Sequence, residues 1–213
     1  MPSMQQVPSG LAGHPDRLSW NARYQSGFGG SFTPHPIVVR ALSMPIPDGP
    51  VLELASGPSG SALLAAAAGH RVTAVDASDV ALAMLGEEAR RRDLGDAVTL
   101  VNADLGSWHP DPGSYSLVFC TGYWDRAVFS RAADAVSPGG LLGWEAYTTE
   151  VQRVRPGFPA DWCLAPGEPA SLLPAGYTVL GPDELTDNER GARRHLLARR
   201  GSDAASGIPI RSR

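Results

Sequence analysis

Residues 51–78 read VLELASGPSGSALLAAAAGHRVTAVDAS, and this stretch decides the fold. The apolar run at 51–54 predicts a buried strand that leads into a turn of small residues. Residues 61–68 have an alanine-rich helical pattern, which Gly69 closes as a left-handed cap. The apolar run at 71–76 predicts a second strand. Strand, helix and strand in this order predict a βαβ unit with parallel strands.

The same alternation continues through the rest of the chain. Further strands are predicted at 98–101, 115–120, 141–147, 177–180 and 194–199, and further helices at 15–24, 36–42, 79–92 and 126–136. The proline-crowded stretch at 150–174 predicts a long loop with a short helix near 170–173. The last two strands are joined by a polar connection, which predicts an antiparallel pair at the sheet edge. The fold class is α/β: a Rossmann-like, doubly wound, seven-stranded, mostly parallel sheet with helices on both faces.

A length of 213 residues with 43% hydrophobic residues fits one domain with a substantial core. Residues 1–14 and 201–213 are rich in Pro, Gly and Ser, which predicts disorder at both ends. The folded domain is therefore expected at 15–200, with a helical segment at 15–48 ahead of the first strand.

The charge and cysteine content exclude several classes of function. The formal net charge is −4, so no strong positive field is available to hold a nucleic acid. The longest apolar stretch, 62–68, is too short for a membrane span, and residues 1–16 lack the pattern of a secretory signal. Two cysteines make neither a disulfide framework nor a four-ligand metal site. All 18 cationic residues are arginines, which excludes lysine-dependent chemistry. We expect a cytoplasmic protein, monomer or homodimer, with no nucleic-acid, membrane or metal partner.

Three polar positions follow successive predicted strands. Glu53 begins a turn of small residues that ends at Gly60, where backbone N–H groups can approach a ligand closely. Asp76 ends the second strand, where a carboxylate can accept both hydroxyls of a ribose. Asp104 follows the third strand and can accept from an exocyclic amine. Each position also has a purely structural interpretation, as a turn, a helix cap or a loop acid.

These positions and their flanks resemble the class I S-adenosylmethionine-dependent methyltransferases, especially the small-molecule branch that includes tellurite-resistance and thiopurine-type methyltransferases. The similar segments are WNARY (20–24), residues 51–78, VNADL (101–105), YSLVFCTGYWDRAVF (115–129), VSPGGLLGWEAYTTE (136–150) and APGEPASLLPAGYTVL (165–180). The resemblance covers about residues 16–200. It implies an enzyme that transfers a methyl group from S-adenosyl-L-methionine to a small-molecule acceptor.

The resemblance also implies which residues hold the cofactor. Glu53 is implied to face the methionine amino group, Asp76 the ribose hydroxyls and Asp104 the adenine amine. Residues at 20–24 are implied to close as a lid over the cofactor's carboxylate. The full implied set is Trp20, Arg23, Tyr24, Glu53, Ala55, Gly57, Ser59, Asp76, Ala77, Asp104, Leu105, Cys120 and Thr121.

The turn departs from the family's D/E-x-G-x-G-x-G pattern, because Ala55 and Ser59 replace the outer glycines. Ser59 could donate its hydroxyl to the ligand or merely replace glycine. The departure keeps a second hypothesis open, namely a methyltransferase-like binding or regulatory module that has lost catalysis. A nicotinamide-dependent Rossmann oxidoreductase is a third hypothesis, but the G-x-G-x-x-G pattern it requires is missing.

A base is needed only if the methyl acceptor must lose a proton. Polar and aromatic side chains expected near the mouth of the sheet are His35, His109, Tyr123, Trp124, Asp125, Glu145 and Tyr147. Of these, His35, Tyr123 and Asp125 are the catalytic candidates. His35 lies between two prolines and could roof the pocket or be an ordinary loop histidine. Asp125 starts a predicted helix and is equally expected as its cap.

Overall fold

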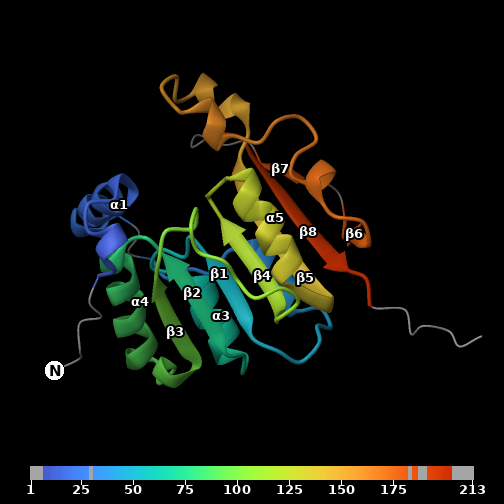
Figure 1. Cartoon of the computed structure of the whole chain (residues 1–213), viewed down its shortest axis with the longest axis horizontal. Coiled ribbons are helices and arrows are strands. Elements are labelled where there is room, and N and C mark those ends of the chain that lie inside the picture. Colours follow the sequence, from blue (N-terminus) through green and yellow to red (C-terminus); the bar gives the residue numbers. More distant parts are fainter. Residues whose placement is uncertain (1–6, 29–30, 182–183, 187–190, 203–213) are drawn as a thin grey trace, which may run out of the picture.

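The computed structural model describes residues 7–28, 31–181, 184–186 and 191–202. Within these residues one mixed sheet carries helices on both faces (Figure 1). The helices are α1 (Pro15–Gln25), α2 (Pro36–Leu42), α3 (Gly60–Ala67), α4 (Asp79–Arg91) and α5 (Arg126–Ala135). The strands are β1 (Val51–Leu54), β2 (Val72–Asp76), β3 (Val98–Asn102), β4 (Tyr115–Thr121), β5 (Val136–Tyr147), β6 (Tyr177–Val179), β7 (Glu184–Thr186) and β8 (Arg193–Arg200). No described helix is long and apolar enough to cross a bilayer.

Seven strands follow one another in the order β3-β2-β1-β4-β5-β8-β6. The first five of these pair in parallel, whereas β8 runs antiparallel to both β5 and β6. The predicted doubly wound, mostly parallel sheet with an antiparallel edge pair is confirmed. The three-residue β7, which pairs with β8, was not predicted. The order in which the chain adds strands switches from one side of β1 to the other at β4, and in such sheets ligands bind at the carboxyl ends of the strands beside this switch point.

Alternate residues along the strands form two separate cores. On one face, side chains such as Val51, Phe119 and Leu141 pack under α2, α3 and α4. On the other face, side chains such as Leu52 and Trp144 pack under α5. This period-two alternation shows which way each polar residue near a strand end points.

Local signals start and stop the helices where the sequence predicted. Ser78 caps α4 by accepting from the N–H of Ala81, and Pro36 occupies the first turn of α2. Gly69 has φ +92° just after α3, as expected of a left-handed cap. Of these, the Ser78 cap fixes the turn from β2 to α4 at the carboxyl edge of the sheet, whereas Gly69 lies between α3 and β2 at the opposite edge.

Two predicted boundaries were wrong. The strand expected at 141–147 begins at Val136, directly after α5, because Val136 already pairs with Tyr115. A register shift between Tyr115 and Leu117 absorbs the irregular Pro-Gly-Gly segment at 138–140. At the N-terminus, residues 9–11 form a 3₁₀ helix with Leu11 buried. The rest of the disorder expectation, at 1–6 and 203–213, lies outside the described residues.

The proline-rich stretch after β5 folds over the same end of the sheet as α1 (Figure 1). It contains 3₁₀ helices at Thr149–Arg153, Ala160–Trp162 and Ala170–Leu172, the last near the predicted short helix. Glu168 ties the stretch to α5 by accepting two hydrogen bonds from Arg126, of 2.7 and 2.9 Å. This long connection is therefore a fixed part of the site's surroundings.

Candidate active site

The turn between β1 and α3 keeps its backbone open to close approach. Ala55 and Gly57 have φ values of +49° and +55°, in the left-handed region that favours glycine. A Cβ on Gly57 would lie 2.8 Å from the hydroxyl oxygen of Tyr24. Small residues at this turn therefore leave space above the backbone, and Tyr24 of α1 lies in that space.

Glu53, near the end of β1, is a buried carboxylate with one oxygen left over. The residue is 2% exposed, and its Oε1 accepts a 2.7 Å hydrogen bond from the Ser59 hydroxyl. Oε2 has no hydrogen-bond partner among the described residues. Burial raises the pKa of Glu53 to about 8, with the Ser59 hydrogen bond opposing the rise and nearby Asp76 adding to it. A ligand cation beside Oε2 would satisfy this oxygen and favour the ionised form.

All hydrogen-bonding positions of the Ser59 hydroxyl are occupied within the protein. Its oxygen accepts 3.0 Å hydrogen bonds from the N–H groups of Ser61 and Ala62, which caps α3. Its hydroxyl proton goes to Glu53. A serine hydroxyl offers one donor and two acceptor positions, and all three are occupied. Ser59 therefore positions Glu53 and starts the helix, and it has no donor left for a ligand.

Asp76 closes the opposite side of the turn. Its Oδ2 accepts from the N–H of Gly57 at 2.8 Å, and its Oδ1 accepts from the N–H of Ser78 at 2.7 Å. Burial raises the pKa of Asp76, and the two N–H groups oppose this rise. Each carboxylate oxygen has a second lone pair, so both can still accept from a ligand hydroxyl.

The end of β3 supports Asp76 from the neighbouring strand. The side-chain amide of Asn102 donates to the carbonyls of Asp76 and Ala77, at 3.1 and 2.9 Å, and its buried Oδ1 has no hydrogen-bond partner in the part of the chain that the structure describes. Asp104 lies in the following turn and accepts from the N–H of Gly106, while Leu105 is buried beside it. Sequence reasoning missed the role of Asn102, although its place at the end of a parallel strand beside Asp76 was a usable signal.

Residues at and just after the end of β4 differ in whether they line a cavity. Thr121 lines a cavity, whereas the Cys120 thiol is fully buried, and burial raises its pKa well above the usual value. Asp125 accepts from the N–H of Val128 and caps α5, the structural role considered for it. Tyr123 packs against the core under α5, and burial raises the pKa of its hydroxyl. Neither Asp125 nor Tyr123 lines the cavity.

The aromatic and cationic residues of the implied lid lie together on α1. The ring centroids of Trp20 and Tyr24 are 5.7 Å apart, and the Arg23 guanidinium lies 4.8 Å from the Trp20 ring centroid. The helix is anchored to the start of α4, where Asp79 accepts a 2.6 Å hydrogen bond from Arg17. This anchoring holds α1 over the turn that follows β1.

A cavity of about 340 Å³ opens at the carboxyl edge of β1 and β4. Glu53, Thr121 and His35 line it together with the first residues of α3. Of the three catalytic candidates, His35 alone lines the cavity. Glu53, with its unpartnered Oε2, and His35 thus line the same cavity.

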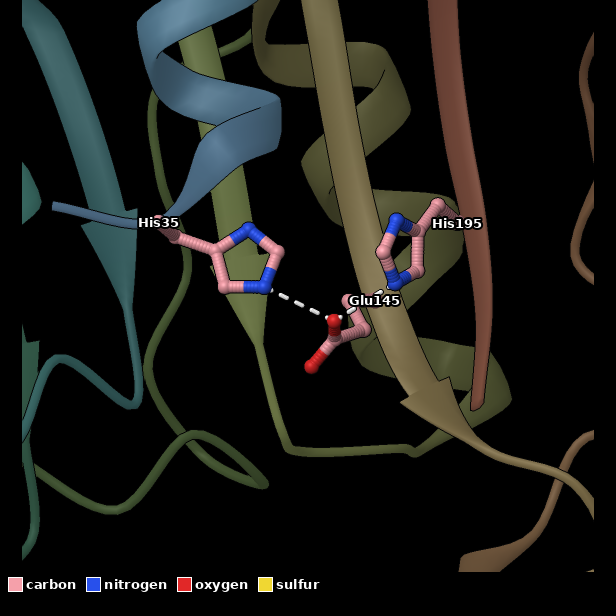
Figure 2. A group of neighbouring side chains, drawn as sticks. All are labelled: His35, Glu145 and His195. Atoms are coloured by element: carbon pink, nitrogen blue, oxygen red, sulfur yellow. Dashed lines mark hydrogen bonds and ion pairs between the residues drawn. The ribbon is translucent and has the colours of Figure 1, made fainter. Parts of the chain in front are cut away.

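Glu145, near the end of β5, lies among three nitrogen-bearing side chains. Its Oε2 is 2.7 Å from His35 Nε2 and 2.8 Å from His195 Nε2 (Figure 2). Its Oε1 accepts a 2.7 Å hydrogen bond from Arg193. Burial pushes the pKa of Glu145 upward, but the contacts with His195, His35 and Arg193 outweigh it and hold the pKa below its usual range. This carboxylate is therefore ionised across the neutral range.

Strand pairing aligns Thr121, Glu145 and His195 in one row across the sheet. Thr121 of β4 pairs with Glu145 of β5, which pairs in turn with His195 of β8. By alternation, all three side chains point to the face covered by α2, as does Glu53. Sequence reasoning named Glu145 near the mouth but missed His195 and Arg193. The signal was the alternating RRHLLARR stretch (193–200), which had been read only as an edge strand.

Comparison with known proteins shows what this chain is similar to. The model of a family described as "Methyltransferase domain" matches residues 51–140. No curated protein sequence matches the chain. Among solved structures, magnesium protoporphyrin IX methyltransferase from Synechocystis, with bound S-adenosylhomocysteine, is 16% identical with a TM-score of 0.66, covering 87% of this chain and 98% of its own.

Two further structures show the same similarity. TehB from Haemophilus influenzae is 18% identical with a TM-score of 0.66, covering 84% of this chain and 66% of its own. An S-adenosylmethionine-dependent methyltransferase from Mesorhizobium loti is 19% identical with a TM-score of 0.58, covering 76% and 95%. Residues 51–140 thus match a methyltransferase-domain model, and the chain has the Rossmann-like fold seen in S-adenosylmethionine-dependent methyltransferases.

Proposed function

We propose that the chain is an enzyme that uses S-adenosyl-L-methionine to methylate a small-molecule acceptor. The observation that carries this proposal is the unpartnered Oε2 of Glu53, buried at the switch point of the sheet and lining the cavity. An uncompensated buried carboxylate oxygen is costly, so a site of this kind is built for a cationic ligand group. The ammonium of a methionine moiety supplies such a group.

The other residues of the turn fit the rest of the cofactor. Asp76 keeps one free lone pair on each oxygen for the ribose hydroxyls, and Asn102 fixes the backbone of Asp76 and Ala77 beneath them. Ala77, Asp104 and Leu105 are proposed to surround the adenine. The cofactor, when bound, supplies a methyl group on a positively charged sulfur.

The chain's own contribution is to position the groups and to exclude water. Methyl transfer is an in-line displacement, and holding two reactants in line supplies much of the acceleration. Thr121 and the backbone after β4 are proposed to flank the reacting carbon, with His35 above the cavity. The acceptor enters from the side of β5 and β8, where the row of polar residues continues.

We further propose that residues 15–48 act as a lid, with Trp20, Arg23 and Tyr24 meeting the cofactor. The support is that Tyr24 already lies over Gly57, in space that a ligand must share. Amide exchange over residues 16–28 should therefore slow when S-adenosylhomocysteine saturates the protein. Unchanged exchange would remove the lid but leave the methyltransferase proposal standing.

The function is tested by measuring S-adenosylhomocysteine binding and then its release from S-adenosylmethionine across thiols, phenols, amines and tellurite. Binding together with turnover of at least one acceptor class supports the enzyme. Binding without any turnover supports the catalytically lost module instead. A folded protein that binds neither form of the cofactor contradicts the proposal.

A further inference from the structure

The cluster around Glu145 contains two histidines, and hydrogen bonding fixes the proton of the first. The N–H of Ile37 donates to Nδ1 of His35 at 3.3 Å, as part of the cap of α2. A nitrogen that accepts a backbone N–H carries no proton of its own. The ring proton of neutral His35 therefore sits on Nε2 and points at Glu145 Oε2, 2.7 Å away.

The second histidine is fixed by the charge it faces. Nε2 of His195 lies 2.8 Å from the same oxygen of an ionised carboxylate, although the two are not aligned as a regular hydrogen bond. An unprotonated nitrogen at this distance would set one lone pair against another, so the proton belongs on Nε2. Nδ1 of His195 then carries the free lone pair. Figure 2 shows this nitrogen turned away from Glu145.

This nitrogen is accessible. The side chain of His195 is 19% exposed, and within the described residues Nδ1 has no hydrogen-bond partner. The charged and titratable groups around the ring are Glu145 on β5, His35 ahead of α2 and Arg193 on its own strand, and strand pairing sets Glu184 of β7 opposite His195. Glu145 provides a fixed negative charge beside the ring and orients it, as the carboxylate does in a catalytic triad.

The same three side chains could be considered a divalent-cation site, because their ligand atoms lie within 4.8 Å of one another. A cation on Nε2 of His35 would require the proton to move to Nδ1, where it would face the N–H of Ile37. Metal-bound histidines instead donate their second N–H to an acceptor. The hydrogen bonding thus favours proton transfer over metal binding.

We infer that His195 is the general base of the methyl transfer and that Glu145 is its positioning residue. This inference rests on the proposed function. The acceptor's O–H proton moves to Nδ1 of His195 as the oxygen forms its bond to the methyl carbon. The carbon–sulfur bond breaks with its electron pair staying on sulfur, and the imidazolium later releases the proton to water.

The surroundings point to a phenol as the acceptor class. Tyr147 lies two residues beyond Glu145 on the same face of β5, and its ring centroid is 5.0 Å from that of Phe158. Trp162, 55% exposed, continues this wall with its centroid 6.0 Å from Phe158. The guanidinium groups of Arg193 and Arg155 already lie over the Tyr147 ring, 4.3 and 5.4 Å from its centroid, so the exposed Trp162 ring is the one that can stack on a flat aromatic ligand. A phenol is largely protonated at neutral pH and therefore needs a base.

The ring protons are tested first, without any acceptor. Imidazole nitrogen–proton correlation spectra of the ¹⁵N-histidine-labelled full chain should show both His35 and His195 protonated on Nε2, with H195Q and H35Q assigning the signals. E145Q should release His195 into a mixture of tautomers. A proton on Nδ1 of His195 in the wild type overturns the inference. So does stoichiometric binding of added Zn²⁺ that shifts both rings.

Kinetics with phenol and 4-nitrophenol test the base directly. H195Q should lower kcat for phenol about 10²–10⁴-fold and remove the acid limb of the pH profile. It should lower kcat much less for 4-nitrophenol, which ionises without help near pH 8. The control is H70Q, because His70 lies at the opposite end of β2 and should leave both rates unchanged. Equal losses on both phenols, or turnover of thiols with none of phenols, overturn the inference while S-adenosylhomocysteine binding still supports the proposed function.

Discussion

Glu53 and Glu145 are the same residue type, point to the same face of the sheet and are almost equally buried, at 2% and 3% exposure. Their surroundings are opposite. Glu53 has a serine hydroxyl on one oxygen and no hydrogen-bond partner on the other among the described residues, and burial raises its pKa to about 8. Glu145 has Arg193 and two histidines, and its pKa lies below the usual range. A buried carboxylate without a cation needs a ligand, whereas one that already has its cations can orient them.

The largest expected effect on stability comes from removing the Glu145 carboxylate, whose two oxygens already have nitrogen-bearing partners. Glu145→Ala leaves Arg193 without its carboxylate, and breaking a buried ion pair costs about 3–5 kcal/mol of unfolding free energy. Glu87→Ala on the exposed face of α4 is the control and should change stability by less than about 0.5 kcal/mol. Urea unfolding of both variants at neutral pH measures the difference. Equal stability of the two would mean that Glu145 is not paired as described.

The pH dependence of Glu145 has a definite sign. Because its folded-state pKa is depressed, the stabilisation is present above its ordinary value of 4.5 and is lost as pH falls through the lower folded value. The stability gap between wild type and Glu145→Gln should therefore shrink in acid. A gap that widens below this value would contradict the ion pairing.

Glu53 should behave in the opposite way. Its raised pKa means that stability present below 4.5 is lost as pH rises through about 8, a loss on the order of 5 kcal/mol. Glu53→Gln cannot ionise and should lack this loss, so its stability relative to wild type should rise between these values. Thermal or urea unfolding across this range measures the relative slope. Parallel slopes would show that Glu53 ionises normally in the folded state.

Ser59→Ala should have a smaller effect on both stability and the carboxylate. It removes a helix cap, worth about 1 kcal/mol, and the donor to Glu53. Losing that donor should also raise the pKa of Glu53 further, which carboxyl ¹³C titration can follow. Ser130→Ala on the exposed face of α5 is the control and should leave both quantities unchanged. An unchanged Glu53 pKa in Ser59→Ala would show that the Ser59 hydroxyl does not influence the ionisation of Glu53.

The surroundings of Glu53 and those of Glu145 were not equally predictable from sequence. The surroundings of Glu53 lie within one continuous strand–turn–helix–strand stretch, where caps such as Ser78 and Gly69 are local signals. The surroundings of Glu145 depend on the antiparallel pairing of β5 with β8, which brings together residues about fifty positions apart in the sequence. No local pattern marked His195 as the partner of Glu145. The early start of β5 was missed for the same reason, since Val136 joins the strand only through its pairing with Tyr115.

The most direct test of the account is the proton released when S-adenosylhomocysteine binds. Near pH 7 Glu53 is mostly protonated without ligand, because its pKa is about 8. An ammonium placed on Oε2 should ionise it and release about one proton. Calorimetric titrations in buffers of different ionisation enthalpy should show this release in wild type and its loss, with weaker binding, in Glu53→Gln. Equal affinity for both proteins with no proton released by either would contradict the central role of Glu53.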